Sequence, residues 1–517
     1  MRRQLAVFDF TVESTVSTIS CTRGDRSPTQ RRRADCCVFQ VMKVKNLYIQ
    51  TIGCQMNVYD SEKIASALVS LNYRKTADIG AADLIIVNTC AIREKAEQKV
   101  FSFLGRLSRL KKIRPNLLIG VGGCVAQQQG EKILARAPFV DLVFGTHAIA
   151  RLPRMVKGAE KHAGRVVDVE TAVAAEPFNE PPELLITGQI SRFVTIMQGC
   201  DNYCTYCVVP YVRGREASRR PEDIIAEIER LAAAGVREVT LLGQNVNSYG
   251  EKEGLCNFPE LLTRVNAVDG LLRIRFTTSH PKDLSTALCR AFRDLPKLCR
   301  HIHLPVQSGS NPVLKRMNRR YTRENYLKKV AELRKYCPQI AVSSDFIVGF
   351  PGEEPADFEQ TLDLIRTVEF DSLFAFKYSD RPEAPASRFN DKVPEREQNM
   401  RLQRLLEEQD RITLFKHRSL LGSIQEVLVE GVNRRHSPSD GDAGKPAVGS
   451  SQWTGRTSAN KIVNFEQDAL PAPMRENLKG RLVRVKIEKA HAHSLWGIPL
   501  SGATVPSAVK GEKSYAA

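Results

Sequence analysis

The chain has 517 residues, 42% of them apolar and 26% charged, a balance that excludes an intrinsically disordered protein. At about 150 residues per domain, this length predicts three or four domains. No apolar run approaches the roughly 20 residues that a membrane-spanning helix needs, which excludes an integral membrane protein. The 76 Lys and Arg exceed the 58 Asp and Glu by 18, and this excess favours a polyanionic partner such as nucleic acid.

Residues 1–41 differ in composition from the rest of the chain. They carry seven Arg, no Lys and many Ser and Thr, as an organelle transit peptide does, but their four acidic residues are too many for a good one. The alternative, which we favour, is that translation begins at Met42, where a strand-like run starts. In both cases the fold is predicted without residues 1–41.

From Leu47 onward, predicted strands and helices alternate. Apolar runs typical of buried strands, and apolar spacing typical of helices, cover residues 47–52, 60–71, 84–87, 93–110 and 117–121. This alternation predicts a parallel α/β domain over residues 45–161. Residues 172–185, rich in Ala, Glu and Pro, are expected to form a linker.

A second alternation fills residues 186–416. Six predicted strands begin near residues 193, 238, 273, 301, 341 and 372. Helical patterns separate them, for example residues 221–234, with Ser218 as the expected cap. Six βα units predict a partial barrel, short of the full eight. A charged amphipathic helix over residues 401–421 is expected to close it.

The last part, residues 418–502, changes character. Residues 424–429 and 482–487 alternate with period two, which predicts a small β-barrel or sandwich. Residues 437–451 form a low-complexity insertion within it, and residues 503–517 a tail. The predicted fold class is therefore α/β, with a parallel α/β domain, a partial (β/α)6 barrel and a small C-terminal β-barrel.

The 13 cysteines, an odd number scattered over a long chain, argue against a disulfide scaffold and for a reducing compartment. Cys200, Cys204 and Cys207 form CxxxCxxC just after the first barrel strand. Three thiolates on one short loop suit three corners of a cubane iron–sulfur cluster, with the fourth iron open. A zinc site is the alternative, but zinc usually takes a fourth protein ligand and paired CxxC spacing.

Three further cysteines, Cys54, Cys90 and Cys124, are distant in sequence but share a context. Each follows a predicted parallel strand, and parallel strands bring their carboxyl ends to one edge of the sheet. Neighbouring glycines permit close backbone approach. The sequence therefore predicts that these thiols converge on a second cluster. The other cysteines match no motif.

The CxxxCxxC spacing resembles that of the radical S-adenosylmethionine (SAM) superfamily. The segments around the three distant cysteines, residues 51–57, 88–95 and 122–124, resemble the N-terminal domain of the methylthiotransferases. Residues 242–247, 277–281, 303–309 and 343–353 are similar to the same family. The C-terminal part resembles the TRAM module, a small RNA-binding barrel. The resemblance spans residues 42–502. The loop at Tyr378–Pro385 departs from it by lacking a Gly-Thr pair at Glu383-Ala384.

This resemblance implies two 4Fe-4S clusters and SAM as cofactors. The cluster on Cys200, Cys204 and Cys207 would carry SAM, and the cluster on Cys54, Cys90 and Cys124 would present sulfur. Tyr206 matches the position that packs the adenine of SAM. Polar side chains at the strand ends are further candidates for holding SAM: Gln244, Asn245, Thr278, Ser279, Gln307 and Asp345.

The versions of the cysteine motifs resemble the branch that adds a methylthio group to C2 of N6-isopentenyladenosine at position 37 of tRNA. The alternatives are a methylthiotransferase for threonylcarbamoyladenosine or for a ribosomal-protein aspartate, and an RNA-binding iron–sulfur protein without catalysis. An intact CxxxCxxC argues against the last.

The implied partner is the tRNA anticodon loop, since RNA reading favours unpaired bases. Candidate cationic contacts are Arg213, Arg215, Arg219, Arg220, Arg456, Lys461, Arg481, Arg484 and Lys486. We also expect an external electron donor such as a flavodoxin or ferredoxin, a sulfur source, a monomer, and a cytoplasmic location, or a mitochondrial one if residues 1–41 are a transit peptide.

Overall fold

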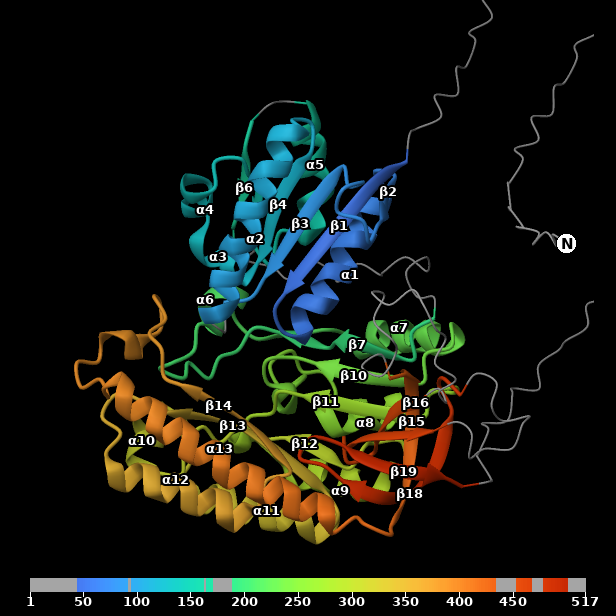
Figure 1. Cartoon of the computed structure of the whole chain (residues 1–517), viewed down its shortest axis with the longest axis vertical. Helices are drawn as coiled ribbons and strands as arrows, with labels where there is room; N and C mark the ends of the chain where they lie inside the picture. The colour runs from blue at the N-terminus through green and yellow to red at the C-terminus, as the bar shows by residue number, and fades with distance from the viewer. Residues whose placement is uncertain are drawn as a thin grey trace, which may run out of the picture. The chain divides into compact units, whose positions relative to one another are not determined.

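The computed structural model describes residues 44–91, 94–161, 164–170, 188–433, 452–466 and 478–500, and Figure 1 labels its helices and strands. The leader, linker, insertion and tail set apart in the sequence lie outside the described residues. Inside them, two parallel α/β units and a closed β-barrel follow one another along the chain, which confirms the predicted fold class. No helix among the described residues is long and apolar enough to cross a bilayer.

The first unit, as far as it is described, is a parallel sheet in the order β2-β1-β3-β4-β5-β6. Its strands are β1 (Lys45–Ile52), β2 (Tyr73–Lys75), β3 (Leu84–Thr89), β4 (Leu118–Gly123), β5 (Leu142–Phe144) and β6 (Val166–Asp168). One apolar core joins the sheet to α2 (Glu94–Ile113), α3 (Cys124–Gln129) and α4 (Glu131–Arg136); another joins it to α1 (Gln55–Val69) and α5 (Leu152–Lys161). Because both faces are covered, β3 is buried along its whole length.

The second unit contains all six predicted barrel strands. They are β7 (Ser191–Thr195), β10 (Glu238–Leu242), β11 (Arg273–Thr277), β12 (His301–His303), β13 (Ala341–Val348) and β14 (Ser372–Lys377). They form two parallel sheets, β7-β10-β11 and β12-β13-β14, and an isolated bridge between Ile274 and Leu298 spans the junction. The partial barrel is therefore confirmed.

Six helices pack against these strands in the largest apolar core of the described chain. They are α7 (Pro221–Ala233), α8 (Phe258–Asn266), α9 (Thr286–Asp294), α11 (Arg323–Tyr336), α12 (Pro355–Val368) and α13 (Glu395–Arg418). The predicted cap of α7 is wrong: Arg220, not Ser218, precedes its first residue. Proline at the first helical position holds the preceding residue extended, so the helix begins at Pro221. Ser218 lies instead in β9 (Ala217–Ser218), which pairs with β8 (Met197–Gln198).

The third unit is a closed barrel in the order β15-β16-β17-β19-β18. Its strands are β15 (Ile424–Val432), β16 (Gln452–Thr457), β17 (Ile462–Glu466), β18 (Leu482–Ala490) and β19 (Leu495–Pro499). The turn between β16 and β17 contacts the amino ends of the partial-barrel strands. Arg275 Nη2 donates to the carbonyl oxygen of Thr457 at 2.8 Å, and Lys461 Nζ lies 3.0 Å from Asp371 Oδ1. These buried polar contacts fasten the small barrel to the larger one.

Candidate active site

The first cysteine group forms where three neighbouring strands end together. Ile52 of β1 pairs with Thr89 of β3, and Thr89 pairs with Gly123 of β4. Cys54, Cys90 and Cys124 follow these strand ends directly. Cys54 shares a hydrogen bond with Cys90, and the pKa of Cys124 is raised by burial and further by the charge of Cys54. Cys54 therefore interacts with both Cys90 and Cys124, although no three His, Cys, Asp or Glu side chains of the described residues are grouped closely enough to hold a single metal ion.

Small and amide side chains hold these loops together. A Cβ atom added to Gly53 would lie 2.8 Å from the Cβ of Cys90, so this close approach requires glycine. Asn57 Oδ1 accepts from the N–H of Cys54 at 3.2 Å, while its Nδ2 donates to the carbonyl oxygen of Thr89 at 2.9 Å. Asn57 thus ties the loop after β1 to the end of β3 and fixes the spacing of Cys54 and Cys90.

Cys54 occupies the amino end of α1, a position that favours a thiolate. Its pKa is lowered to about 6, first by the hydrogen bond with Cys90, and further by the charge of Arg213 and by backbone N–H groups at Asn57 and Met56. Burial opposes this shift. The thiolate form, which metals bind, is therefore favoured at this cysteine near neutral pH.

The second cysteine group lies on the loop that follows β8. Gly199 opens this loop at φ +75°, where an added Cβ would lie 2.0 Å from the carbonyl oxygen of Arg215. Burial and the neighbouring Cys204 raise the pKa of Cys207 to about 12, and burial also raises that of Cys200. Thiols crowded in this way need a cationic partner to ionise, which an iron–sulfur cluster provides.

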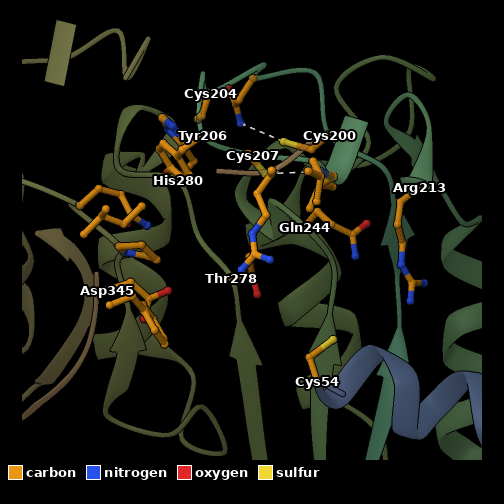
Figure 2. A pocket seen from close by; sticks show the side chains of 18 of the residues that line it. Cys54, Cys200, Cys204, Tyr206, Cys207, Arg213, Gln244, Thr278, His280 and Asp345 are labelled. Atoms are coloured by element: carbon orange, nitrogen blue, oxygen red, sulfur yellow. Dashed lines mark hydrogen bonds between the residues drawn. The ribbon is translucent and has the colours of Figure 1, made fainter. Parts of the chain in front are cut away.

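Cysteines of both groups line one cavity of ≈330 Å³, and Figure 2 shows some of the side chains around it. Eleven of the thirteen predicted site residues line it: Cys54, Cys124, Cys200, Cys204, Cys207, Tyr206, Gln244, Thr278, Ser279, Gln307 and Asp345. These eleven residues therefore share one cavity between the two cysteine groups.

Cys90 and Asn245 are not among the residues that line the cavity. Cys90 is buried and hydrogen-bonded to Cys54. Asn245 is 1% exposed; its Nδ2 donates to Asp283 Oδ2 at 2.7 Å, and its Oδ1 accepts from the N–H of His280 at 3.0 Å. The structure thus gives the Asn245 amide an internal role, namely joining the loops after β10 and β11.

Two polar residues of the cavity hold strained backbone conformations. Thr278 has φ +69° and Gln307 has φ +78°, in the left-handed region that side chains with a Cβ rarely adopt. Such strain is often found at ligand sites, where the surrounding structure fixes it. Gln244 Oε1 and Ser279 Oγ are buried, and neither makes a hydrogen bond within the described protein, as expected of atoms that meet a ligand.

His280 is a cavity residue that the sequence reasoning did not single out. Its Nδ1 accepts from the N–H of Lys282 at 3.3 Å, and burial strongly lowers its pKa, so the ring is neutral with its proton on Nε2. That nitrogen has no protein partner among the described residues. Its place in the segment 277–281, which resembles the methylthiotransferases, was the signal that could have identified it.

Three of the nine predicted RNA-contacting cations are internal. Arg213 pairs with Asp60, Arg219 with Glu227 and Lys461 with Asp371, and all three cations are buried. They are therefore not available at the surface. Arg215, Arg220, Arg484 and Lys486 are exposed.

The donor sets fit two clusters rather than two zinc ions. Each group supplies three thiols, and a buried arginine acts on each: Arg319 Nη1 donates to Cys204 Sγ, and the charge of Arg213 acts on Cys124. Zinc ligands all reach one atom at about 2.3 Å, whereas each cubane ligand binds a different iron.

Comparison with known families assigns each of the three units. The uncharacterized protein family UPF0004 matches residues 46–145, the radical SAM superfamily matches residues 194–365, and the TRAM domain matches residues 446–500. The central unit, with its CxxxCxxC loop, is therefore a radical SAM domain, and the chain is of the radical SAM class.

The closely similar proteins define the family more narrowly. The tRNA-2-methylthio-N(6)-dimethylallyladenosine synthase of Desulfosudis oleivorans is 53% identical over 455 residues, covering 88% of this chain and 97% of that protein. The protein of the same name from Geobacter metallireducens is 52% identical over 456 residues, covering 88% and 98%. This chain belongs to the tRNA-2-methylthio-N(6)-dimethylallyladenosine synthase family.

Similarity to solved structures is more distant. The radical SAM methyltransferase TsrM from Kitasatospora setae, with cobalamin and a [4Fe-4S] cluster bound, is 15% identical, with a TM-score of 0.49. The match covers 67% of this chain and 74% of that one.

Proposed function

We propose that this protein adds a methylthio group to C2 of N6-isopentenyladenosine (N6-dimethylallyladenosine) at position 37 of tRNA. The observation that carries the proposal is the shared cavity: thiols of the radical SAM loop and thiols of the N-terminal domain line the same ≈330 Å³ space. Replacing an aromatic C–H by C–S–CH3 needs both a radical source and a sulfur source within reach of one base. A single cavity lined by cysteines from both sets meets that need.

The cofactors are two 4Fe-4S clusters and SAM. We assign one cluster to Cys200, Cys204 and Cys207 and the other to Cys54, Cys90 and Cys124, each with one iron left open. When bound, these groups supply a radical able to remove hydrogen from an aromatic carbon, and the sulfur and methyl group that replace it. The protein supplies binding and orientation.

Around SAM, the chain would act through the cavity residues. Tyr206 packs beside Phe350 and Tyr378, and its hydroxyl accepts from Arg319 Nη1 at 3.3 Å, which fixes the ring that we assign to the adenine. Gln244 Oε1 and Ser279 Oγ offer unpaired polar atoms, and Thr278, Gln307 and Asp345 complete the assigned set. We assign Asn245 to joining the loops after β10 and β11 and not to binding SAM.

The substrate is tRNA, and the TRAM barrel supplies an RNA-binding surface. Exposed Arg484 and Lys486 of β18 are suited to phosphate contacts. The target base must leave its stack to enter the chamber.

We further propose that the electrons come from a flavodoxin or ferredoxin, that an external donor restores the consumed sulfur, and that the enzyme acts as a cytoplasmic monomer. All ten cysteines in the described part of the chain are free thiols, in keeping with a reducing compartment.

The test is anaerobic reconstitution with iron, sulfide, SAM and a reductant, followed by reaction with tRNA that carries N6-isopentenyladenosine. The wild-type protein should form both 5′-deoxyadenosine and the methylthio nucleoside. Cys200→Ala should form neither, whereas Cys54→Ala should still cleave SAM but form no methylthio product. Methylthio product from Cys54→Ala would refute the assignment of the second cluster, and Cys289→Ala, a buried cysteine of α9, serves as the control.

A further inference from the structure

Arg213 stands between the two cysteine groups. It is the last residue of α6 (Val209–Arg213), which begins two residues after Cys207. Its side chain is 5% exposed and lines the shared cavity, and its Nη2 lies 2.6 Å from Asp60 Oδ2 of α1. Burial raises the pKa of the Cys124 thiol, which lines the same cavity, and the positive charge of Arg213 opposes this effect. One arginine of the radical SAM domain thus pairs with a carboxylate of the N-terminal domain and acts electrostatically on one of its predicted cluster ligands.

The helix that carries Arg213 is itself packed on the N-terminal domain. Val208 and Val212 share an apolar cluster with Ala91, Cys124 and Val125. Thr146 Oγ1 donates to the carbonyl oxygen of Val212 at 2.8 Å. The loop of Cys207 and the loops of Cys90 and Cys124 are therefore joined through α6, and Arg213 is the charged member of that junction.

The charges at this point favour a specific role. A buried guanidinium is costly unless its donors and its charge are matched. Asp60 offers one carboxylate, while the planar fork of arginine presents five N–H donors in fixed directions. The positive charge of Arg213 is therefore matched best when the sulfur of Cys124 is anionic, as that of a cluster ligand is.

We propose that Arg213 is a positioning residue for the N-terminal cluster, whose electrostatic environment it sets by sharing its positive charge between Asp60 and Cys124. The inference rests on the proposed function, because it requires a cluster on Cys54, Cys90 and Cys124. It assigns to Arg213 an internal role instead of the RNA contact expected from the sequence.

The two partners of the ion pair should affect the cluster in opposite directions. Net charge and hydrogen bonds to the sulfurs set the reduction potential of an iron–sulfur cluster. Loss of the Arg213 charge disfavours the more negative, reduced state, so the midpoint potential should fall. Loss of the Asp60 charge leaves Arg213 uncompensated, so the midpoint potential should rise. A merely structural ion pair predicts no such opposition, since both substitutions break the same contact.

The experiment uses the full-length chain with Cys200, Cys204 and Cys207 all replaced by alanine, so that the N-terminal cysteines alone can hold the cluster. Iron and sulfide contents establish loading, and an anaerobic redox titration followed by electron paramagnetic resonance gives the midpoint potential. Arg213→Gln should move the midpoint to more negative values and Asp60→Asn to more positive ones. Arg213→Lys, which keeps the charge, should stay nearer the parent.

Arg215→Gln is the matched control, because the Arg215 side chain is 83% exposed and pairs only loosely with Asp201, at 3.6 Å. Its midpoint potential should equal the parent value. The double variant Arg213→Gln/Asp60→Asn should also lie close to the parent, since the two charge changes cancel.

Equal midpoints, or shifts of the same sign, in Arg213→Gln and Asp60→Asn would overturn the inference while leaving the cluster assignment intact. If Arg213→Gln fails to load iron, loading by Arg213→Lys supports the role of the charge, and failure of both variants overturns it. A parent protein that binds no cluster would refute the assignment of Cys54, Cys90 and Cys124, and the inference with it.

Discussion

Arg319 Nη1 donates a hydrogen bond to Cys204 Sγ at 3.4 Å. Arg319 is 4% exposed, and its Nε donates to the hydroxyl of Tyr321 at 2.9 Å. A buried cation thus lies against the radical SAM cysteines, as Arg213 lies against the N-terminal group. This shared arrangement links the reactivity of each group to one arginine.

Arg319→Gln should lower the rate of SAM cleavage about ten- to hundredfold, because a hydrogen bond to a charged group contributes about 1.5–3 kcal/mol. Formation of 5′-deoxyadenosine in the reconstituted protein measures this rate. Arg320→Gln, at the exposed neighbouring position, should leave it unchanged. Equal rates in the two variants would show that the contact with Cys204 does not matter.

Arg219 and Arg220 are adjacent in sequence but differ in environment. Arg219 Nη1 lies 2.7 Å from Glu227 Oε2 with both side chains 4% exposed, whereas Arg220 pairs with Asp223 at the surface. Arg219→Gln leaves a buried carboxylate unpaired and should cost about 3–5 kcal/mol of stability. Arg220→Gln should change stability by at most about 0.5 kcal/mol.

Thermal unfolding of the purified proteins checks this pair of variants. The midpoint temperature of Arg219→Gln should fall by several degrees, and that of Arg220→Gln should match the wild type. If Arg219→Gln were fully stable but bound tRNA weakly, the original expectation of an RNA contact at this position would be correct.

The exposed cations of β18 should contribute to tRNA affinity in a salt-dependent way. Removing Arg484 or Lys486 should reduce the slope of log affinity against log salt by roughly 0.7–0.9 per cation that contacts a phosphate. Titration of fluorescent tRNA at several salt concentrations measures the slope. Glu488→Gln, which removes the acid 3.1 Å from Lys486, should strengthen binding instead. Unchanged slopes in both cation variants would place the RNA elsewhere.

Arg275 should hold the TRAM barrel in place. It donates to Glu238 Oε2 at 2.8 Å within the partial barrel and to the carbonyl oxygen of Thr457 in the β16–β17 turn. Arg275→Met should leave these buried acceptors unpaired, at about 1–3 kcal/mol each, and loosen the small barrel. Limited proteolysis should then release a C-terminal fragment faster than in Arg300→Met, whose parent residue is exposed. Equal proteolysis would contradict this docking.

Local patterns in the sequence were sufficient to predict β1, β3, β4 and the six barrel strands, and they drew attention to six of the cysteines. The alternation of apolar runs reports burial directly, and parallel strands carry the residues that follow them to one edge. Cys54, Cys90 and Cys124 could therefore be placed together although about 35 residues separate each from the next. Short strands such as β5 and β6 were missed because three residues are too few to show a pattern of apolar residues typical of a strand.

The roles of the arginines could not be predicted, because their partners are remote in the chain. Arg213 meets Asp60 from 153 residues away, and Arg275 meets Thr457 from 182 residues away. Nothing in the local sequence distinguishes such a buried arginine from the exposed Arg215 or Arg220. Asn245 was assigned to SAM for the same reason: a polar residue at a strand end points to a site, but only the fold shows which bonds it already makes.

The most direct test of the central claim is nucleoside mass spectrometry of bulk tRNA from a strain that lacks this gene, with and without restoration of residues 42–517. The account predicts that N6-isopentenyladenosine accumulates and that its methylthio derivative returns on restoration, which would also show residues 1–41 to be dispensable. Unchanged methylthiolation of N6-isopentenyladenosine would contradict the account and direct attention to threonylcarbamoyladenosine or a ribosomal-protein aspartate.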